Sequence, residues 1–119
     1  MLSQMKFAKI VFWVAGALGL VASVGLYFQP GSYVYYGLIA GVLSWQLVFF
    51  LIALDPQRYR PMMIPAVLEK LIWVVTLAYL HLRGQVTASE LASGAIPHGL
   101  LGVLFVIAYL RMPRREAAA

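Results

Sequence analysis

The sequence predicts an all-α membrane protein, a single bundle of four transmembrane helices joined by short loops. Four apolar stretches, at about residues 7–28, 33–54, 62–82 and 91–110, are each near the ~20 residues that cross a ~30 Å hydrocarbon core. Hydrophobic residues make up 63% of the chain and charged residues only 11%. A water-soluble domain of this composition would expose a large apolar surface. The whole chain, 1–119, is therefore expected to form one transmembrane domain.

The first two helices carry small residues at four-residue spacing. Ala15, Gly19 and Ser23 share one face of the first helix, and Gly37 and Gly41 share one face of the second. Small side chains let helix backbones approach closely in a membrane. We expect both faces to pack inside the bundle, because each helix already has neighbours there, and the alternative is a dimer interface.

Short polar segments mark the helix ends. Residues 29–32 (QPGS) have the composition of a tight turn between the first two helices. Asp55 and the proline after it end the second helix. Thr87 and Glu90 have the spacing of a capping box, which predicts the start of the fourth helix and a structural role for Glu90.

The basic residues predict the orientation, because Lys and Arg concentrate in cytoplasmic loops. One side of the membrane would carry only Arg83, whereas the other would carry seven basic residues: Lys6, Lys9, Arg58, Arg60, Arg111, Arg114 and Arg115. We therefore expect a multi-pass protein with both termini in the cytoplasm. The net charge of +5 lies at span ends, where it contacts lipid headgroups, so nucleic-acid binding is not expected.

The loop between the second and third helices is expected to face the headgroups. Its polar residues are Asp55, Arg58, Tyr59 and Arg60, and their type favours contact with membrane lipids. Lys70 lies inside the third span, and its long side chain is expected to extend back toward these headgroups.

Glu69 is the most informative polar residue, because an acidic group inside a span is costly without a partner. Counting from the span ends places Glu69 at a depth of about 10 Å and Gln46 at about 12 Å. The two side chains are therefore expected to share a hydrogen bond. Two interpretations remain open: structural pairing, with Gln46 or a loop arginine, and a functional carboxyl that exchanges protons.

His98 lies seven residues into the fourth span, near the depth of Thr76 on the third. A polar line from Gln46 through Glu69 and Thr76 to His98 is conceivable, although His98 leans outward and Glu69 inward. A hydrogen-bonded structural histidine is the favoured interpretation and a proton carrier the alternative. No metal site is expected, since His98 and Glu69 have no third ligand nearby, and no pattern indicates a cofactor.

The segment from residue 55 to residue 70, DPQRYRPMMIPAVLEK, resembles the central motif of a family of small uncharacterised bacterial four-span membrane proteins. In size and layout the chain is also loosely similar to DoxX-like membrane proteins. The motif covers about sixteen residues, and the rest of the likeness is topology. The resemblance implies a bacterial inner-membrane protein, and it supplies no catalytic or ligand-binding residues.

Three classes of function fit the sequence. The favoured one is a non-enzymatic accessory or scaffold subunit that packs against lipids, a membrane protein partner or a second copy. The second is a proton-coupled transporter or a binder of a lipophilic molecule, with Glu69 in a cavity near Trp45, Gln46 and Trp73. The third is an enzyme that acts on lipid or quinone, which would need Glu69 and His98 as an acid–base pair.

Overall fold

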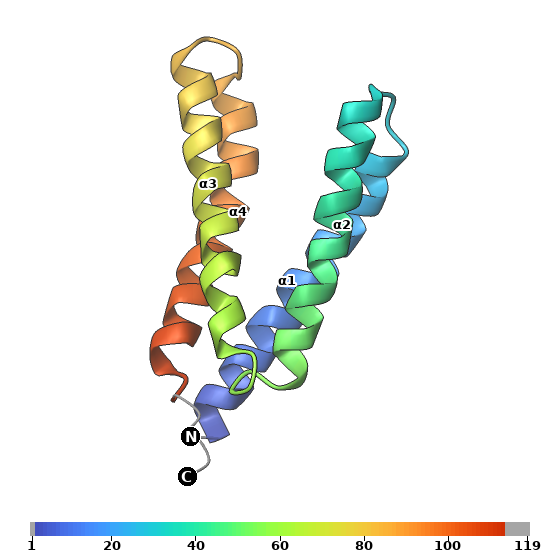
Figure 1. Ribbon diagram of the computed structural model, residues 1–119. Helices are drawn as coiled ribbons and strands as arrows, with labels where there is room; N and C mark the ends of the chain where they lie inside the picture. The colour runs from blue at the N-terminus through green and yellow to red at the C-terminus, as the bar shows by residue number, and fades with distance from the viewer. Residues whose placement is uncertain (1, 114–119) are drawn as a thin grey trace.

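A computed structural model describes residues 2–113 of the protein and shows an all-α fold (Figure 1). Arg114 and Arg115, counted above for orientation, lie outside the described residues. The helices are α1 (Leu2–Tyr27), α2 (Tyr33–Leu54), the short 3-10 helix η1 (Arg60–Met62), α3 (Met63–Leu82) and α4 (Ala88–Arg111). Each of the four α-helices is long and apolar enough to cross a membrane. The predicted four-helix membrane fold is thus confirmed.

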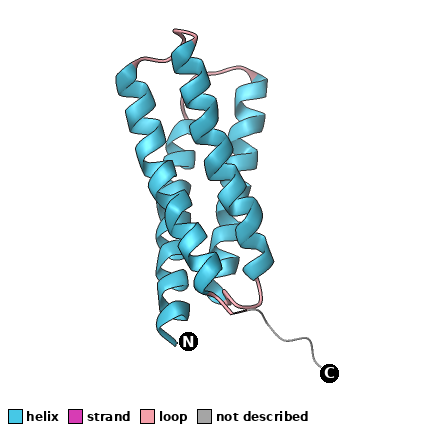
Figure 2. Cartoon of the chain, turned by 90° about the vertical axis from the view of Figure 1, so that its left-hand side faces the viewer, coloured by secondary structure: helices cyan, strands magenta, loops and turns pink. Residues whose placement is uncertain are grey.

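The four helices form two hairpins that meet at one end only. Helices α1 and α2 make one hairpin and α3 and α4 the other, and contact between α1 and α4 joins them. In Figure 1 the hairpins converge near the N-terminus and separate toward their turns, which gives a V shape. We call these the closed end and the open end. Figure 2 shows the same long helices and short loops from the side.

Two helices begin before their apolar spans, and for α4 the start is the one that the capping box at Thr87 predicts. Helix α1 begins at Leu2 and not near residue 7, because its first residues, including Lys6, favour helix without needing to enter hydrocarbon. Helix α4 begins at Ala88, directly after its cap Thr87, whose hydroxyl accepts a 3.1 Å hydrogen bond from the Glu90 amide. Hydropathy locates the apolar part of each helix, whereas capping determines where the helix begins.

Each hairpin is closed by its own turn. Ser32 caps α2 by accepting a hydrogen bond from the Tyr35 amide at 3.3 Å, and the Tyr35 hydroxyl donates to the Leu26 carbonyl at 2.9 Å. The second turn follows α3, where Gly84 has a φ of 73°, a conformation that glycine adopts without strain. These bonds lie within one hairpin, so they do not draw the two hairpins together.

The core lies at the closed end. Three fully buried phenylalanines from three helices form its centre: Phe12 and Phe105 stack with ring centroids 4.4 Å apart, and Phe49 lies 5.3 Å from Phe105. Met63 of α3 is also fully buried and belongs to the same cluster. All four helices therefore contribute to one core, which holds the hairpins together at this end.

The small-residue face of α1 packs against α2. Ala15 and Ser23 are buried, and a Cβ at Gly19 would collide with the side-chain amide of Gln46. The prediction of internal packing is wrong for α2, however. A Cβ at Gly37 or Gly41 would meet no side chain of the described residues within 4 Å. These two glycines lie on an exposed face of α2.

Candidate functional site

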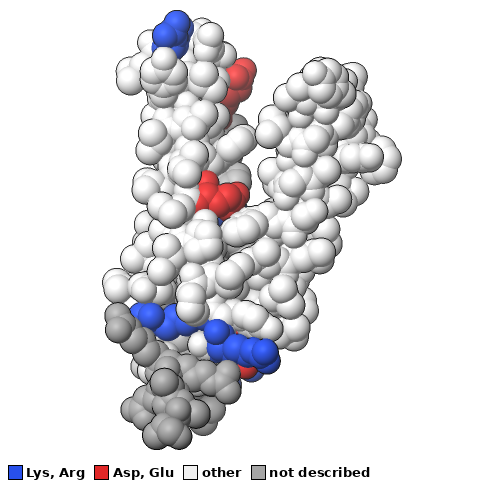
Figure 3. Space-filling view, in the orientation of Figure 1, with Lys and Arg blue, Asp and Glu red and all other residues white. Residues whose placement is uncertain are grey.

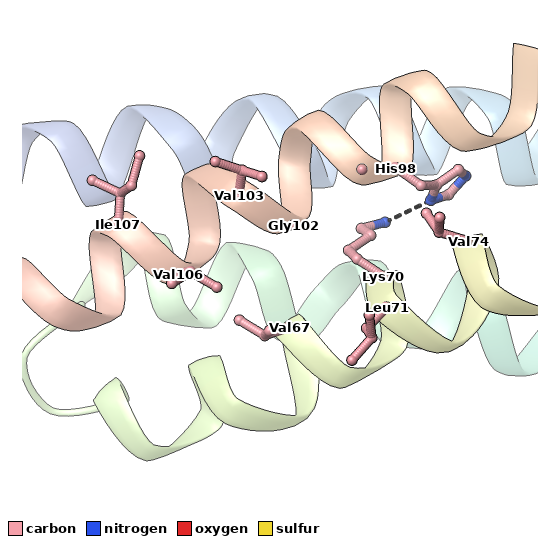
Figure 4. Close-up of a pocket in the computed structure, with 10 residues that line it drawn as sticks. Val67, Lys70, Leu71, Val74, His98, Gly102, Val103, Val106 and Ile107 are labelled. Atoms are coloured by element: carbon pink, nitrogen blue, oxygen red, sulfur yellow. Dashed lines mark hydrogen bonds between the residues drawn. The ribbon is translucent and has the colours of Figure 1, made fainter. Parts of the chain in front are cut away.

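Lys70 is the central residue of the polar cluster between α3 and α4. It is only 4% exposed, and its Nζ lies 3.3 Å from Nδ1 of His98 and 3.4 Å from Oε2 of Glu69. Figure 4 shows Lys70 of α3 and His98 of α4 joined across the helix interface. The same Nζ lies 5.2 Å from the ring centroid of Phe49. The ammonium thus has an imidazole, a carboxylate and an aromatic ring as neighbours.

This arrangement corrects the expectation that Lys70 would reach the headgroups. Lys70 lies seven residues into α3, about 10 Å from its start. Its side chain instead turns toward α4, where Nδ1 of His98 accepts a hydrogen bond from the Lys70 ammonium and Glu69 compensates its charge. These two interactions stabilise the buried ammonium within the bundle. The Lys70 side chain therefore does not need to extend toward the headgroups.

Local backbone geometry explains how Lys70 fits against α4. Gly102 lies one turn after His98, and a Cβ there would come within 3.2 Å of the Lys70 Cβ. The glycine therefore leaves room for the lysine stem. Trp73 flanks the cluster one turn along α3, with its ring centroid 5.3 Å from that of His98. Because successive residues of a helix point about 100° apart, Glu69 and Lys70 face different directions.

Glu69 is the exposed member of the Glu69–Lys70 pair. Its side chain is 31% exposed, compared with 5% for that of Lys70. Figure 3 shows acidic surface on the α3–α4 hairpin, at the base of the gap between the two hairpins. We call this gap the inter-hairpin cleft: it lies between α2 and α3, on the open-end side of Phe49. Trp45 of α2 packs against Phe49 from that side, with ring centroids 6.4 Å apart.

Three buried polar atoms of residues 2–113 have no hydrogen-bond partner: Trp45 Nε1, Gln46 Oε1 and Glu69 Oε2. Glu69 Oε2 is within ion-pair distance of Lys70, but the two groups are not aligned for a hydrogen bond. An unpaired polar atom in hydrocarbon costs several kcal/mol by order of magnitude. The structure thus holds a buried indole N–H beside Phe49 and a buried carboxylate oxygen beside Lys70, each without a hydrogen-bond partner.

The geometry also defines the hydrogen on His98. With Lys70 protonated, Nδ1 of His98 accepts the hydrogen bond, so the hydrogen of the neutral ring lies on Nε2. His98 therefore offers a second N–H donor. Trp45 Nε1 and Glu69 Oε2 are themselves covered, and the exposed part of the cluster is the remainder of the Glu69 side chain.

The expected pair of Gln46 and Glu69 is not formed. Gln46 is buried against α1 beside Gly19, and its Nε2 donates to the Val42 carbonyl at 2.8 Å. Gln46 points toward its own hairpin, away from Glu69. Thr76 is exposed and does not connect Glu69 to His98. The polar line predicted from the sequence is replaced by a compact cluster that contains Lys70.

An apolar groove between α3 and α4 adjoins the cluster, because Lys70 and His98 both line it. It has a volume of about 390 Å³, and the stem of Lys70 forms part of its wall. Figure 4 shows the groove, where aliphatic side chains such as Val67, Val103 and Ile107 line the two helices. Its lining provides space for hydrocarbon but almost no hydrogen-bonding surface. The polar chemistry of the protein is therefore concentrated in the Glu69–Lys70–His98 cluster.

The loop after α2 holds the closed end together. Asp55 Oδ1 accepts a 3.2 Å hydrogen bond from the Arg58 amide, and Arg60 Nε donates to the Met112 carbonyl at 2.8 Å. The Arg60 guanidinium also lies 3.9 Å from the ring centroid of Tyr109, and Tyr59 packs on the core. Arg58 is exposed. Arg60 thus binds the end of α4, which leaves Arg58 as the loop cation directed outward.

Among residues 2–113, no group of three potential ligands comes together to hold a metal ion.

The residue that sequence reasoning missed as part of the site is Phe49, on which Lys70 and Trp45 converge. The residues around Phe49 in α2 are all apolar, so nothing in the local sequence distinguishes Phe49 from its neighbours. Comparison of the chain with protein-family models, curated proteins and solved structures found no match.

Proposed function

We propose that the protein binds a lipophilic molecule taken from the bilayer, with the polar group of that molecule against the Glu69–Lys70–His98 cluster. The observation that carries the proposal is the burial of Lys70 within a membrane-spanning helix, beside a carboxylate that lacks a hydrogen-bond partner. Ionisable residues at such depth are costly and usually mark a ligand or ion pathway.

The shape of the protein supports the proposal. The inter-hairpin cleft is open along its length in Figure 3, so a molecule in the bilayer has access to the base of the cleft. Trp45, Phe49 and Trp73 provide apolar and aromatic contacts around the cluster. Apolar walls with a few convergent polar groups are typical of small-molecule sites. Coupling to protons would extend this function to transport, because three titratable groups are in contact.

A second candidate function is that of an accessory or scaffold subunit. It is favoured by the open face of α2 at Gly37 and Gly41, which meets no described side chain. Small residues on such a face suit close packing against another membrane helix, from a protein partner or a second copy. This function predicts a protein that copurifies with the chain.

An enzyme that acts on lipid or quinone ranks last. Such chemistry would need Glu69 and His98 to approach one reacting group as acid and base. The Lys70 Nζ already occupies the position between them, 3.4 Å from one and 3.3 Å from the other. We therefore favour binding over catalysis.

We further propose that the chain lies in a bacterial inner membrane with both termini in the cytoplasm. The basic residues support this orientation, because Lys6, Lys9, Arg58 and Arg111 all belong to the closed end, where Figure 3 shows a basic band. Arg83 follows α3 at the open end.

The chain has no cysteine, so the single substitutions Ser3→Cys and Gln85→Cys can each be tested with a membrane-impermeant thiol reagent. Labelling at Gln85 alone in intact cells is expected, and labelling at Ser3 alone would reverse the orientation.

The test of ligand binding is native mass spectrometry of the protein extracted gently from its own membrane. We expect a bound small molecule in the wild type that is lost in Glu69→Gln, because the amide no longer compensates Lys70. Glu90→Gln is the matched control, since it makes the same chemical change at an exposed residue of α4. A ligand retained by both variants, or phospholipid alone in all samples, would contradict the proposal. A protein partner present in all samples would favour the scaffold function.

A further inference from the structure

The charges of the cluster sum to zero. Lys70 and Glu69 form an ion pair, and His98 accepts a hydrogen bond through Nδ1 and is therefore neutral. The sum remains zero if the proton moves from lysine to carboxylate. In the described spans, Glu69 and Lys70 are the ionisable residues of α3 that lie away from the helix ends.

A charged ligand would disturb this balance. A carboxylate against Lys70 would compete with Glu69, and the cleft would then hold two negative groups and one positive group. A ligand cation against Glu69 would leave Lys70 without compensation. In either case one charge stays unpaired at a depth where unpaired charge is strongly unfavourable.

A neutral polar group meets partners that are unused. The Glu69 side chain is 31% exposed, so its carboxylate can accept from a hydroxyl hydrogen, and the His98 Nε2–H can donate to a carbonyl or hydroxyl oxygen. Such a ligand would form hydrogen bonds without changing the net charge of the site. The two groups lie on different helices, α3 and α4, and both contact the Lys70 Nζ.

From this balance we propose, resting on the proposed function, that the site selects electrically neutral lipophiles with a hydroxyl or carbonyl group, and that the net charge of residues 69 and 70, which is zero for the Glu69–Lys70 pair, sets the selection. Removal of one member of the pair then changes the preferred ligand charge. Without the glutamate the lysine needs an anion, and without the lysine the glutamate needs a cation.

Three photoactivatable probes with the same diazirine-bearing chain test this inference: dodecanol, dodecanoate and dodecylammonium. Each is crosslinked to the protein in lipid nanodiscs, and labelled peptides are mapped by mass spectrometry. In the wild type we expect the alcohol to label the segments around Trp45 and Glu69 about tenfold more than either ion, equivalent to ~1.4 kcal/mol. Glu69→Gln should prefer dodecanoate, and Lys70→Met should prefer dodecylammonium.

The double variant Glu69→Gln/Lys70→Met controls for damage to the fold, because it is neutral again and should regain the preference for the alcohol. Glu90→Gln should behave as the wild type. Wild-type protein that prefers an ion, or single variants with unchanged preference, would overturn the inference about charge while leaving ligand binding intact. Absence of labelling in these segments by every probe would overturn both the inference and the proposed function.

Discussion

The closed and open ends of this protein use the same kind of apolar helix in different ways. At the closed end all four helices share a core, in which Phe12, Phe49 and Phe105 lie in direct contact. Toward the open end each helix keeps its hairpin partner, while the space between hairpins stays open (Figure 3). The difference teaches that this bundle is stabilised at one end, and its polar cluster lies where the packed region ends.

The position of the cluster follows from this contrast. Phe49 belongs to the closed-end core and also supports the Lys70 ammonium at 5.2 Å. If the two hairpins packed together along their whole length, no molecule could reach Glu69. If they separated completely, Lys70 would lose its contact with Phe49 of α2. The border of the packed core therefore provides both support and access.

The largest expected effect is on the closed end. Phe105→Ala removes a ring that stacks on Phe12 and contacts Phe49, and comparable substitutions in protein cores cost about 3 kcal/mol or more of unfolding free energy. Unfolding in mixed micelles, followed by circular dichroism, measures this loss. Leu100→Ala is the control on the same helix, because Leu100 is 60% exposed. Equal losses in the two variants would show that the aromatic cluster does not hold the hairpins together.

A smaller effect is expected within one hairpin. Gly19→Ala places a methyl group against the side chain of Gln46, whereas Gly25→Ala places one in open space on the same helix. Both changes gain the same helix propensity, so their difference isolates the collision. We expect Gly19→Ala to be less stable than Gly25→Ala by roughly 1–3 kcal/mol. The same micelle unfolding measures the difference, and equal stabilities would mean that Gln46 moves away without cost.

The four spans could be predicted from the sequence because their signal is local. Apolar length, the turn at residues 29–32 and the cap at Thr87 each involve residues close in the chain. The V shape could not be predicted, because α2 is apolar apart from its tyrosines, Ser44 and Gln46, and its sequence does not show which face is buried. Gly37 and Gly41 have the spacing of a packed face, yet they lie on an open one.

The candidate site was predicted in part. Glu69 and His98 were recognised as unusual because polar residues in a span are costly. Their connection through Lys70 depends on Gly102, which lets α4 approach the lysine stem, and on Phe49 from the other hairpin. These contacts join residues distant in the chain, so depth alone paired Glu69 with Gln46, which faces α1.

The smallest effect on stability, and the most direct comparison of the two candidate functions, is expected at the open face of α2. Gly41→Ala adds a methyl group where no described side chain lies within 4 Å. The stability of the isolated protein should be unchanged or raised, by at most about 1 kcal/mol from helix propensity. A loss of stability in micelles would show that this face is packed within the chain itself.

The larger change Gly41→Leu separates the candidate functions. If the face packs against another membrane helix, the bulky side chain should abolish copurification of that partner, because close approach needs small residues. If the protein acts alone as a ligand binder, this variant should keep its bound molecule, since Glu69, Lys70 and His98 are untouched. Glu69→Gln should give the reverse result, with the ligand lost and any partner retained. The two variants therefore assign binding to the cleft and association to the α2 face independently.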